Sequence, residues 1–335
     1  MPLKIVRNDI SRVHADAIVN SANKNPVCGG GAEYHIYEAA GRDELLAARE
    51  KVGPLEIAEV AVTPAFALDA KYIIHVVGPK WNGGESGEEL ALANCYVNVL
   101  NKALELGCES IAFPLISSGV FRFPKDSALK IALQAIGEFL QMHEMDVQLV
   151  VFDRKAFEVS EELCDDIQAY IDDNYVQEKY SAARESICWN RISDGFVNFN
   201  RVEASHAICE LEDKSLEEML ATAGETFCGK LFSIIREKNQ DDVEVYKRAN
   251  LDRTHFSKIR SNVNYKPTKK TALALAIALQ LNLDETKDLL SRAELALSPS
   301  NKGDLIVSYF ITHKKYDIWE INSMLFKFGQ PTLGA

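Results

Sequence analysis

The sequence predicts a three-layer α/β/α domain followed by an all-α domain. Between Leu3 and about Tyr175, short β-branched runs alternate with longer helical patterns, which is typical of α/β folds. Two of the runs, IIHVV and LVV, are apolar on both faces, as expected for strands of a sheet that helices cover on each side. From Thr226 onward the pattern is helical. The fold class is therefore α/β in the first part of the chain and all-α in the last.

The elements of the first domain follow from the same patterns. The β-branched runs predict strands over Leu3–Val6, Ala17–Val19, Glu59–Thr63, Tyr72–Val77, Ser110–Pro114 and Val147–Phe152. The periodicity between these runs predicts helices at about 32–51, 87–106, 125–142 and 157–174.

In the all-α part, side chains that can accept hydrogen bonds from backbone N–H groups mark the helix starts. The expected caps are Asp241 or Asp242, Asp252, Thr268, Asp284, Asp304 and Asp317. The run TALALAIALQL alternates like a strand, but Ala is depleted in strands and favours helices. We therefore predict a buried helix over this run.

Length and composition support two domains. The chain has 335 residues, of which 47% are apolar and 26% charged, and domains typically hold about 150 residues. We expect a domain over 1–175, an acidic and partly helical connector over 176–225, and an all-α domain over 226–335. No apolar run reaches the ~20 residues of a membrane span, and the N-terminus MPLKIVRNDI lacks the features of a signal peptide. We expect a cytoplasmic protein without a membrane partner.

The cysteines predict neither a disulfide framework nor a zinc site. All seven are scattered singly, without a C-x-x-C pair. We expect reduced thiols, no metal and no cofactor.

Charge divides the chain more sharply than its net value of −12 suggests. Residues 226–335 hold 17 Lys/Arg and 12 Asp/Glu, whereas residues 1–225 hold 20 and 37. Because charge per domain is what a partner meets, the basic half keeps a nucleic-acid partner open.

Three N-terminal segments predict a ligand site. Asn20 and Asn23 follow a strand, at the end of the sheet where α/β folds bind ligands. The glycines Gly29–Gly31 precede a helix and can bring backbone N–H groups close to an anion. The loop Ser117–Gly119 again lies between a strand and a helix. Two such loops could hold two phosphates.

In this order, the segments resemble the macrodomain family of ADP-ribose-binding modules, over about half of the chain. The matching segments are Asn8–Ile10, Asp16–Asn23, Gly29–Glu33, Ala39–Gly41, Tyr72–Pro79, Ile116–Pro124 and Val151–Asp153. The resemblance implies that Asp9 and Ile10 meet adenine, that Phe152 lines its pocket, and that Asn20 and Asn23 hold the distal ribose. It also implies a diphosphate cradle made by the residues Gly29, Gly30, Gly31, Ser117, Ser118, Gly119, Val120 and Phe121.

Many family members hydrolyse ADP-ribose esters on protein carboxylates, and in these the glycines lead into V-D-G or V-D-A. This sequence instead reads Ala32-Glu33-Tyr34, so its carboxylate is one methylene longer and a large ring follows it. Two hypotheses stay open. One is a hydrolase that removes mono-ADP-ribose from acidic protein residues, with Asn23 and Glu33 as catalytic residues. The other is a non-catalytic sensor of ADP-ribose or of mono-ADP-ribosylated proteins.

A second group of candidate functional residues lies in the basic part of the chain, residues 226–335. Tyr246–Lys270 holds eight Lys/Arg against Asp252 alone, on two short predicted helices joined by a turn. The frame resembles the repressor-type helix-turn-helix family, with Phe256 and Ile259 as core positions. The resemblance implies that Arg253, Thr254 and Lys258 face DNA bases. Duplex DNA and a protein partner are therefore both possible partners of residues 241–270. A solvated basic face without a partner would also fit this pattern.

Overall fold

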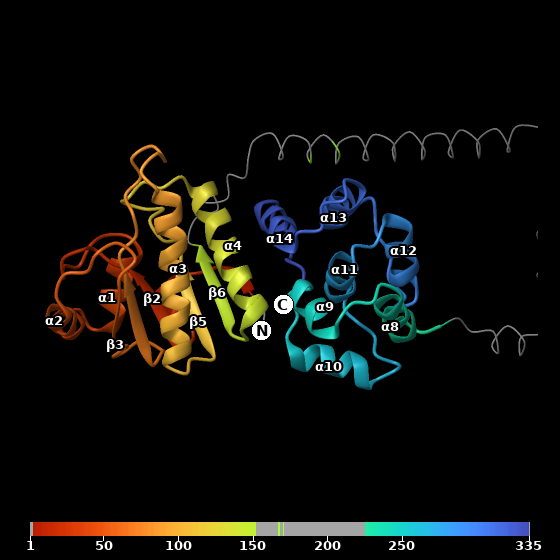
Figure 1. Ribbon diagram of the computed structural model, residues 1–335, viewed down its shortest axis with the longest axis horizontal. Helices are drawn as coiled ribbons and strands as arrows, with labels where there is room; N and C mark the ends of the chain where they lie inside the picture. Colours follow the sequence, from red (N-terminus) through yellow and green to blue (C-terminus); the bar gives the residue numbers. More distant parts are fainter. Residues whose placement is uncertain (1–2, 152–166, 168–169, 171–224, 335) are drawn as a thin grey trace, which may run out of the picture.

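A computed structural model describes residues 3–151, 167, 170 and 225–334 of the chain. Figure 1 shows an α/β part and a helical part, with the two ends of the chain marked between them. The predicted helix at 157–174 and the predicted connector at 176–225 lie outside the described residues, except for Ile167, Tyr170 and Glu225. The domain limits drawn from the sequence therefore remain predictions.

The α/β part is built on one six-stranded sheet of order β1-β6-β5-β2-β4-β3. All neighbours pair in parallel except β3, which is antiparallel to β4 at one edge. The strands are β1 Leu3–Arg7, β2 Ala17–Ser21, β3 Val60–Pro64, β4 Tyr72–Val76, β5 Ser110–Pro114 and β6 Asp146–Val151. All six predicted strands are confirmed to within one or two residues at each end.

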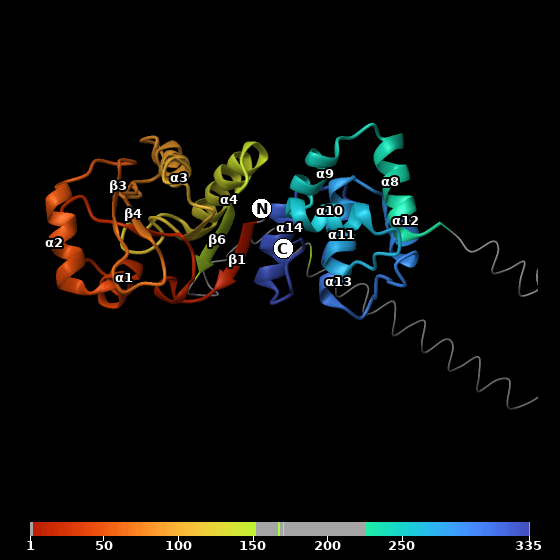
Figure 2. The same cartoon turned by 90° about the horizontal axis from the view of Figure 1, so that it is seen from below.

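Helices cover both faces of this sheet, as Figure 2 shows. They are η1 Ile10–Arg12, α1 Ala32–Ala40, α2 Arg42–Val52, α3 Glu88–Glu105 and α4 Lys125–Met142. One apolar core joins the sheet to α3 and α4, and a second joins it to η1, α1 and α2. The predicted three-layer α/β/α architecture is confirmed.

The prediction of one helix over 32–51 is wrong, because the chain breaks between α1 and α2 at Gly41. This glycine has φ +103°, a conformation that side chains with a Cβ rarely adopt. The break lets α1 and α2 turn against each other over the sheet.

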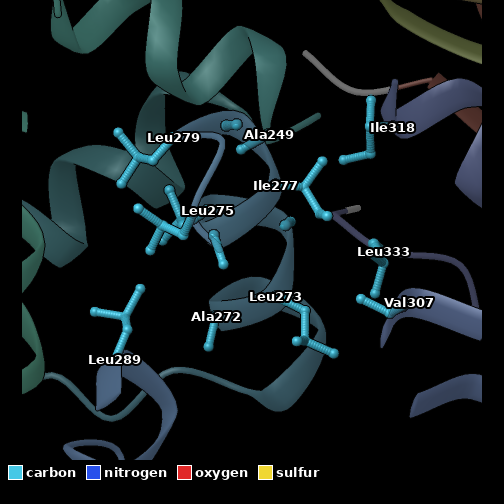
Figure 3. Close-up of a cluster of buried hydrophobic side chains, with 14 of the residues drawn as sticks. Ala249, Ala272, Leu273, Leu275, Ile277, Leu279, Leu289, Val307, Ile318 and Leu333 are labelled. Carbon is cyan, nitrogen blue, oxygen red and sulfur yellow. The ribbon is translucent and has the colours of Figure 1, made fainter. Parts of the chain in front are cut away.

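The helical part comprises α8 Phe227–Glu237, α9 Asp242–Arg248, α10 Arg253–Ser261, α11 Lys269–Ala278, α12 Leu283–Ser291, α13 Lys302–Thr312 and α14 Ile318–Lys327. The helix predicted over TALALAIALQL is confirmed as α11, whose residues from Thr271 on are all buried. Figure 3 shows Leu273, Leu275 and Ile277 of α11 within a cluster that includes Leu289 and Val307 of neighbouring helices. A helix that is apolar all round is expected at the centre of a bundle.

Most of the predicted caps are confirmed. Asp241, Asp252, Thr268 and Asp317 each accept a hydrogen bond from the first turn of their helix. The predictions of Asp284 and Asp304 as caps are wrong, since Asn282 and Asn301 take those positions. Asn282 forms a capping box with Glu285, an arrangement that satisfies more backbone groups than a cap two residues later.

The two parts meet where β1 and α4 face α9 and α14. Asn250 has the left-handed backbone conformation, with φ +54°. It accepts a hydrogen bond from Leu3 N at 2.8 Å and donates one to Leu3 O at 3.0 Å. The Tyr246 hydroxyl donates to Glu144 at 2.9 Å. The ring of Trp319 lies so close to Gly137 of α4 that a Cβ there would come within 2.8 Å of it. The helical part therefore packs on the β1 edge of the sheet.

Within 3–151 and 225–334, no helix is long and apolar enough to cross a membrane, and no group of three or more His, Cys, Asp or Glu could hold a metal ion. In the same ranges, Cys28, Cys95, Cys108 and Cys228 are free thiols.

Candidate functional site

A pocket of about 400 Å³ opens at the carboxyl ends of three neighbouring strands, β6, β5 and β2. Ten of the residues predicted from the sequence line it: Asn23, Gly29, Gly30, Gly31, Glu33, Ser117, Ser118, Gly119, Val120 and Phe121. The carboxyl ends of parallel strands share one edge of a sheet, which is why segments almost 100 residues apart converge here.

The glycine loop gives the pocket one wall. Gly31, at φ +68°, is the cap of α1, so the first N–H groups of the helix open toward the pocket. A Cβ on Gly29 would lie 2.4 Å from both Asn23 Nδ2 and Glu33 Oε2, whereas a Cβ on Gly30 would meet nothing within 4 Å. A side chain at position 29 would therefore displace the Asn23–Glu33 pair, whereas one at position 30 would not.

Glu33 holds this wall together. Its Oε2 accepts hydrogen bonds from Asn23 Nδ2 at 2.6 Å and from Gly29 N at 3.0 Å. Its Oε1 accepts longer ones from Asn20 Nδ2 at 3.3 Å and Asn23 N at 3.4 Å. The side chain is buried, and this desolvation raises the pKa of Glu33 although each of the four hydrogen bonds lowers it.

Behind Glu33, a buried chain of hydrogen bonds leads to β3. Asn20 Nδ2 lies 3.1 Å from His75 Nδ1, and His75 Nε2 lies 2.9 Å from the Thr63 hydroxyl. Burial, aided by Arg49, lowers the pKa of His75 to about 3, so the ring is neutral. Since Asn20 Nδ2 can only donate, Nδ1 of His75 accepts and its Nε2–H donates to Thr63. His75 is therefore a buried core residue whose two ring nitrogens both have partners.

Asn20 itself does not line the pocket. It is fully buried, and its Oδ1 has no partner among the described residues. The amide therefore reaches the site through Glu33, which it helps to position.

The second wall is the loop after β5. Ser117 has φ +63° and is buried, and its hydroxyl also lacks a partner among the described residues. Ser118 Oγ donates to Leu115 O at 2.7 Å, and Phe123 N to Ser117 O at 3.1 Å, which closes the loop. A buried polar atom without a partner carries a free-energy cost that a bound ligand or water removes.

Asp9 and Ile10 lie beyond the β6 end of the pocket and are not part of its lining. Ile10 is buried in the core beside α1. Asp9 accepts hydrogen bonds from the backbone and hydroxyl of Ser11 at 3.0 and 2.8 Å, and pairs with His35 at 3.0 Å. Partial burial opposes ionisation of Asp9, but these contacts outweigh it and lower its pKa. Phe152 lies outside the described residues.

Tyr34, the large ring that follows Glu33, does not enter the pocket. Its side chain is 44% exposed and lies under the guanidinium of Arg42, 6.0 Å from the ring centroid. The unusual residue thus leaves the cavity open.

Two pocket features were not predicted from the sequence. Arg49 of α2 is buried and donates to the carbonyls of Gly53, Asn23 and Lys24, which fixes the backbone that carries Asn23. Lys125, at the start of α4, lines the pocket. A buried Arg on an otherwise charged helix gives no sequence signal, whereas a Lys just after the Ser117 loop could have been noticed.

The residues predicted to contact DNA lie in another part of the molecule. Arg253, Thr254 and Lys258 are exposed on α10, and the predicted core positions Phe256 and Ile259 are buried. Helix α9, the other half of the predicted pair, contacts α4 as well as α10 and α11. The basic residue Arg260 pairs with Asp242 of α9.

The fold and pocket define an α/β domain with two loops suited to an anionic nucleotide. A model of the Macro domain family matches residues 19–132. A macro domain-containing protein of Lactiplantibacillus plantarum is 42% identical over 148 residues, which cover 44% of this chain and 86% of that protein. An O-acetyl-ADP-ribose deacetylase of Citrobacter rodentium is 42% identical over 141 residues, covering 41% and 80%. The chain therefore belongs to the macrodomain family.

Among solved structures, a macrodomain of Oceanobacillus iheyensis with ADP is 37% identical, with a TM-score of 0.45, and the match covers 53% of this chain and 92% of that one.

Proposed function

We propose that the α/β domain binds ADP-ribose and hydrolyses its ester with acidic protein residues. The observation that carries the proposal is the convergence of Asn23, the glycine loop and the Ser117 loop on one pocket. Backbone N–H groups can bind a diphosphate without surplus Lys or Arg, which suits a domain of acidic composition. The diphosphate would lie between the two loops, the adenine toward Asp9, Ile10 and Phe152, and the distal ribose at Asn23.

Glu33 fits the role of a positioning residue in this pocket. Both of its oxygens already accept hydrogen bonds, so the ionised carboxylate holds Asn23 Nδ2 and Gly29 N in place. Asn23 Oδ1 is then left to accept a hydrogen bond from a hydroxyl of the distal ribose or from water. Errors near 1 Å in placing such a group can cost roughly 100-fold in rate.

The reaction adds water across the ester that joins C1″ of the distal ribose to the acceptor carboxyl group. It yields a free Asp or Glu carboxyl on the protein and ADP-ribose with a hydroxyl at C1″. The similar O-acetyl-ADP-ribose deacetylase is named for removing an acyl group from ADP-ribose, and an acyl ester is the same class of bond. This relative supports the hydrolase hypothesis over the sensor hypothesis.

The test pairs calorimetry with a release assay. We expect ADP-ribose binding that Asp9→Ala abolishes, and release of ADP-ribose from an automodified ADP-ribosyltransferase that Glu33→Ala slows by about 100-fold. Unchanged affinity in Asp9→Ala would contradict the position of the adenine. Binding without release over hours would reject the hydrolase and leave the sensor.

In the sensor alternative, the helical part passes the signal to duplex DNA or to a protein. The exposure of Arg253, Thr254 and Lys258 on α10 favours this alternative, since basic side chains on one helix can track phosphates. The packing of α9 on α4 and the pairing of Arg260 with Asp242 favour a structural role instead.

A further inference from the structure

The chain that leaves β4 runs along the Ser117 loop. A Cβ on Gly78 would lie 2.1 Å from Ser117 Oγ. Trp81 N donates to Phe121 O at 3.0 Å, and the rings of Trp81 and Phe123 lie 4.7 Å apart. Lys80 lies between Gly78 and Trp81 in the chain. These contacts therefore fix Lys80 at the rim of the pocket beside Phe121.

Two basic residues lie at this rim, although residues 1–225 hold 37 Asp/Glu against 20 Lys/Arg. Lys80 Nζ lies 5.7 Å from the centroid of the Phe121 ring, and the exposed Arg122 follows directly in the chain. Neither Lys80 nor Arg122 forms an ion pair with any residue of the described ranges. The nearby Glu88 is buried, and its carboxylate accepts hydrogen bonds from the backbone of Asn82, Gly84 and Ser86.

Strand order places this rim at one particular end of the pocket. β4 pairs with β2, and Ala22 N donates to Val76 O at 2.9 Å, so the segment after β4 lies next to Asn23. β1 and β6 lie on the far side of β5 and β2. Lys80 therefore flanks the Asn23 end, where the proposed function places the distal ribose and the bond to be cut.

We propose that Lys80 and Arg122 form an acceptor subsite for an acidic peptide segment, whose carboxylates flank the ADP-ribosylated residue. The inference rests on the proposed function, because the distal ribose must end at Asn23 for its protein acceptor to emerge beside Lys80. An acidic segment suits two cations that have no ion-pair partner among the described residues, whereas a neutral segment would leave them solvated. Exposed ion pairs are weak, so Lys80 and Arg122 are each expected to change the affinity for an acidic conjugate by about threefold.

The test uses three ligands: ADP-ribose alone, and ADP-ribose joined by a hydrolysis-resistant oxime to a peptide with either Glu or Gln flanking the modified residue. In the full chain at low salt, the double variant Lys80→Gln/Arg122→Gln should weaken the Glu-flanked conjugate by about tenfold. The other two ligands should stay within about twofold of the wild type. The matched control Lys4→Gln/Lys51→Gln removes two exposed charges elsewhere in the same domain and should change none of the three.

Equal affinity of the wild type for the two conjugates would overturn the proposal, as would an equal loss for all three ligands in the double variant. A loss confined to ADP-ribose 1″-phosphate, added as a fourth ligand, would show a subsite for a small anion and would also overturn it. Failure of ADP-ribose alone to bind the wild type is a distinct result, because it would remove the proposed function itself.

Discussion

The pocket of the α/β domain and the basic surface of α10 were both predicted from residue patterns, yet they differ in how they are built. The pocket is concave, and its polar groups are fixed by one another: Glu33 holds Asn23, and Arg49 holds the backbone beside it. The α10 surface is a convex helix face whose Arg253 and Lys258 extend into solvent.

This difference shows what distinguishes a ligand-binding site from a solvated, charged helix face. The hydroxyl of Ser117 and the Oδ1 of Asn20 are buried without partners among the described residues. Such groups persist only where a ligand, water or function compensates for their cost. On α10, by contrast, water can solvate each charge at no such cost, and the sequence pattern alone supports the proposed partner.

Among changes to the two walls of the pocket, the largest effect should come from Gly29→Ala, compared with Gly30→Ala. The new Cβ of Gly29→Ala would lie 2.4 Å from Asn23 Nδ2 and from Glu33 Oε2, so the wall of the pocket must rearrange. Overpacking costs about 1–3 kcal/mol, so we expect ADP-ribose affinity, measured by calorimetry, to fall by up to about 100-fold. Gly30→Ala meets open space and should change affinity by less than about threefold. Equal losses in the two variants would show that any side chain in the loop blocks the ligand, and would remove the special role of Gly29.

A somewhat smaller effect is expected from Glu33→Gln. The amide of Gln would place a donor against the donors Asn23 Nδ2 and Gly29 N, so release of ADP-ribose should slow by about 10- to 100-fold while the fold is retained. Single-turnover release assays, with circular dichroism as the folding control, test this. Wild-type rates in this variant would contradict the positioning role.

The raised pKa of Glu33 predicts that the wild type and Glu33→Gln differ in how stability and ligand binding depend on pH. Because desolvation raises this pKa in the folded protein, ionised Glu33 lowers the free energy of unfolding as pH rises through the interval between its unfolded value near 4.5 and its folded value. Ligand binding should change in the opposite sense, since only the carboxylate accepts all four hydrogen bonds. Unfolding and binding curves of wild type minus Glu33→Gln, measured from pH 4 to 8, should therefore slope in opposite directions. Parallel slopes would contradict this account.

Asn250→Gly tests whether the contact between the helical part and strand β1 stabilises the protein. Glycine keeps the left-handed backbone but loses both hydrogen bonds to Leu3, so the free energy of unfolding should fall by about 2 kcal/mol. Urea titration measures this, with Asn239→Gly, another left-handed but exposed position, as the control. An equally small loss in both variants would mean that the junction contributes little.

The smallest effect concerns DNA. If α10 tracks phosphates, a labelled duplex should bind weakly at 50 mM salt, more weakly as salt rises, and not at all to Arg253→Ala/Lys258→Ala. Fluorescence anisotropy measures this. Binding that is insensitive to salt, or absent from the wild type, would remove nucleic acid from the expected partners and leave a structural role for α10.

Sequence patterns were sufficient wherever local chemistry decides the structure. β-branched runs located the strands, and Asp252 and Thr268 marked helix starts because a cap acts within one turn. The sequence patterns failed at Asp284 and Asp304. A nearby Asn can also cap each of these helices, and only the observed geometry shows that the Asn does so.

The site was predictable to a lesser extent. The two loops could be identified by resemblance, but the contacts that order them could not. Tyr34 lies outside the pocket and contacts the Arg42 guanidinium, and the buried position of Arg49 depends on how α2 packs. Both are tertiary effects, since each depends on a partner that no local pattern specifies.

The contact between Asn250 and Leu3 bears on how this protein can be dissected. The outward N–H and C=O of Leu3, at the edge of β1, are capped by a side chain from a residue 247 positions away. A fragment ending before residue 225 would lose this cap, and unpaired groups on an edge strand are templates for strand pairing between molecules. We expect such a fragment to aggregate, so the helical part also protects the solubility of the domain that precedes it.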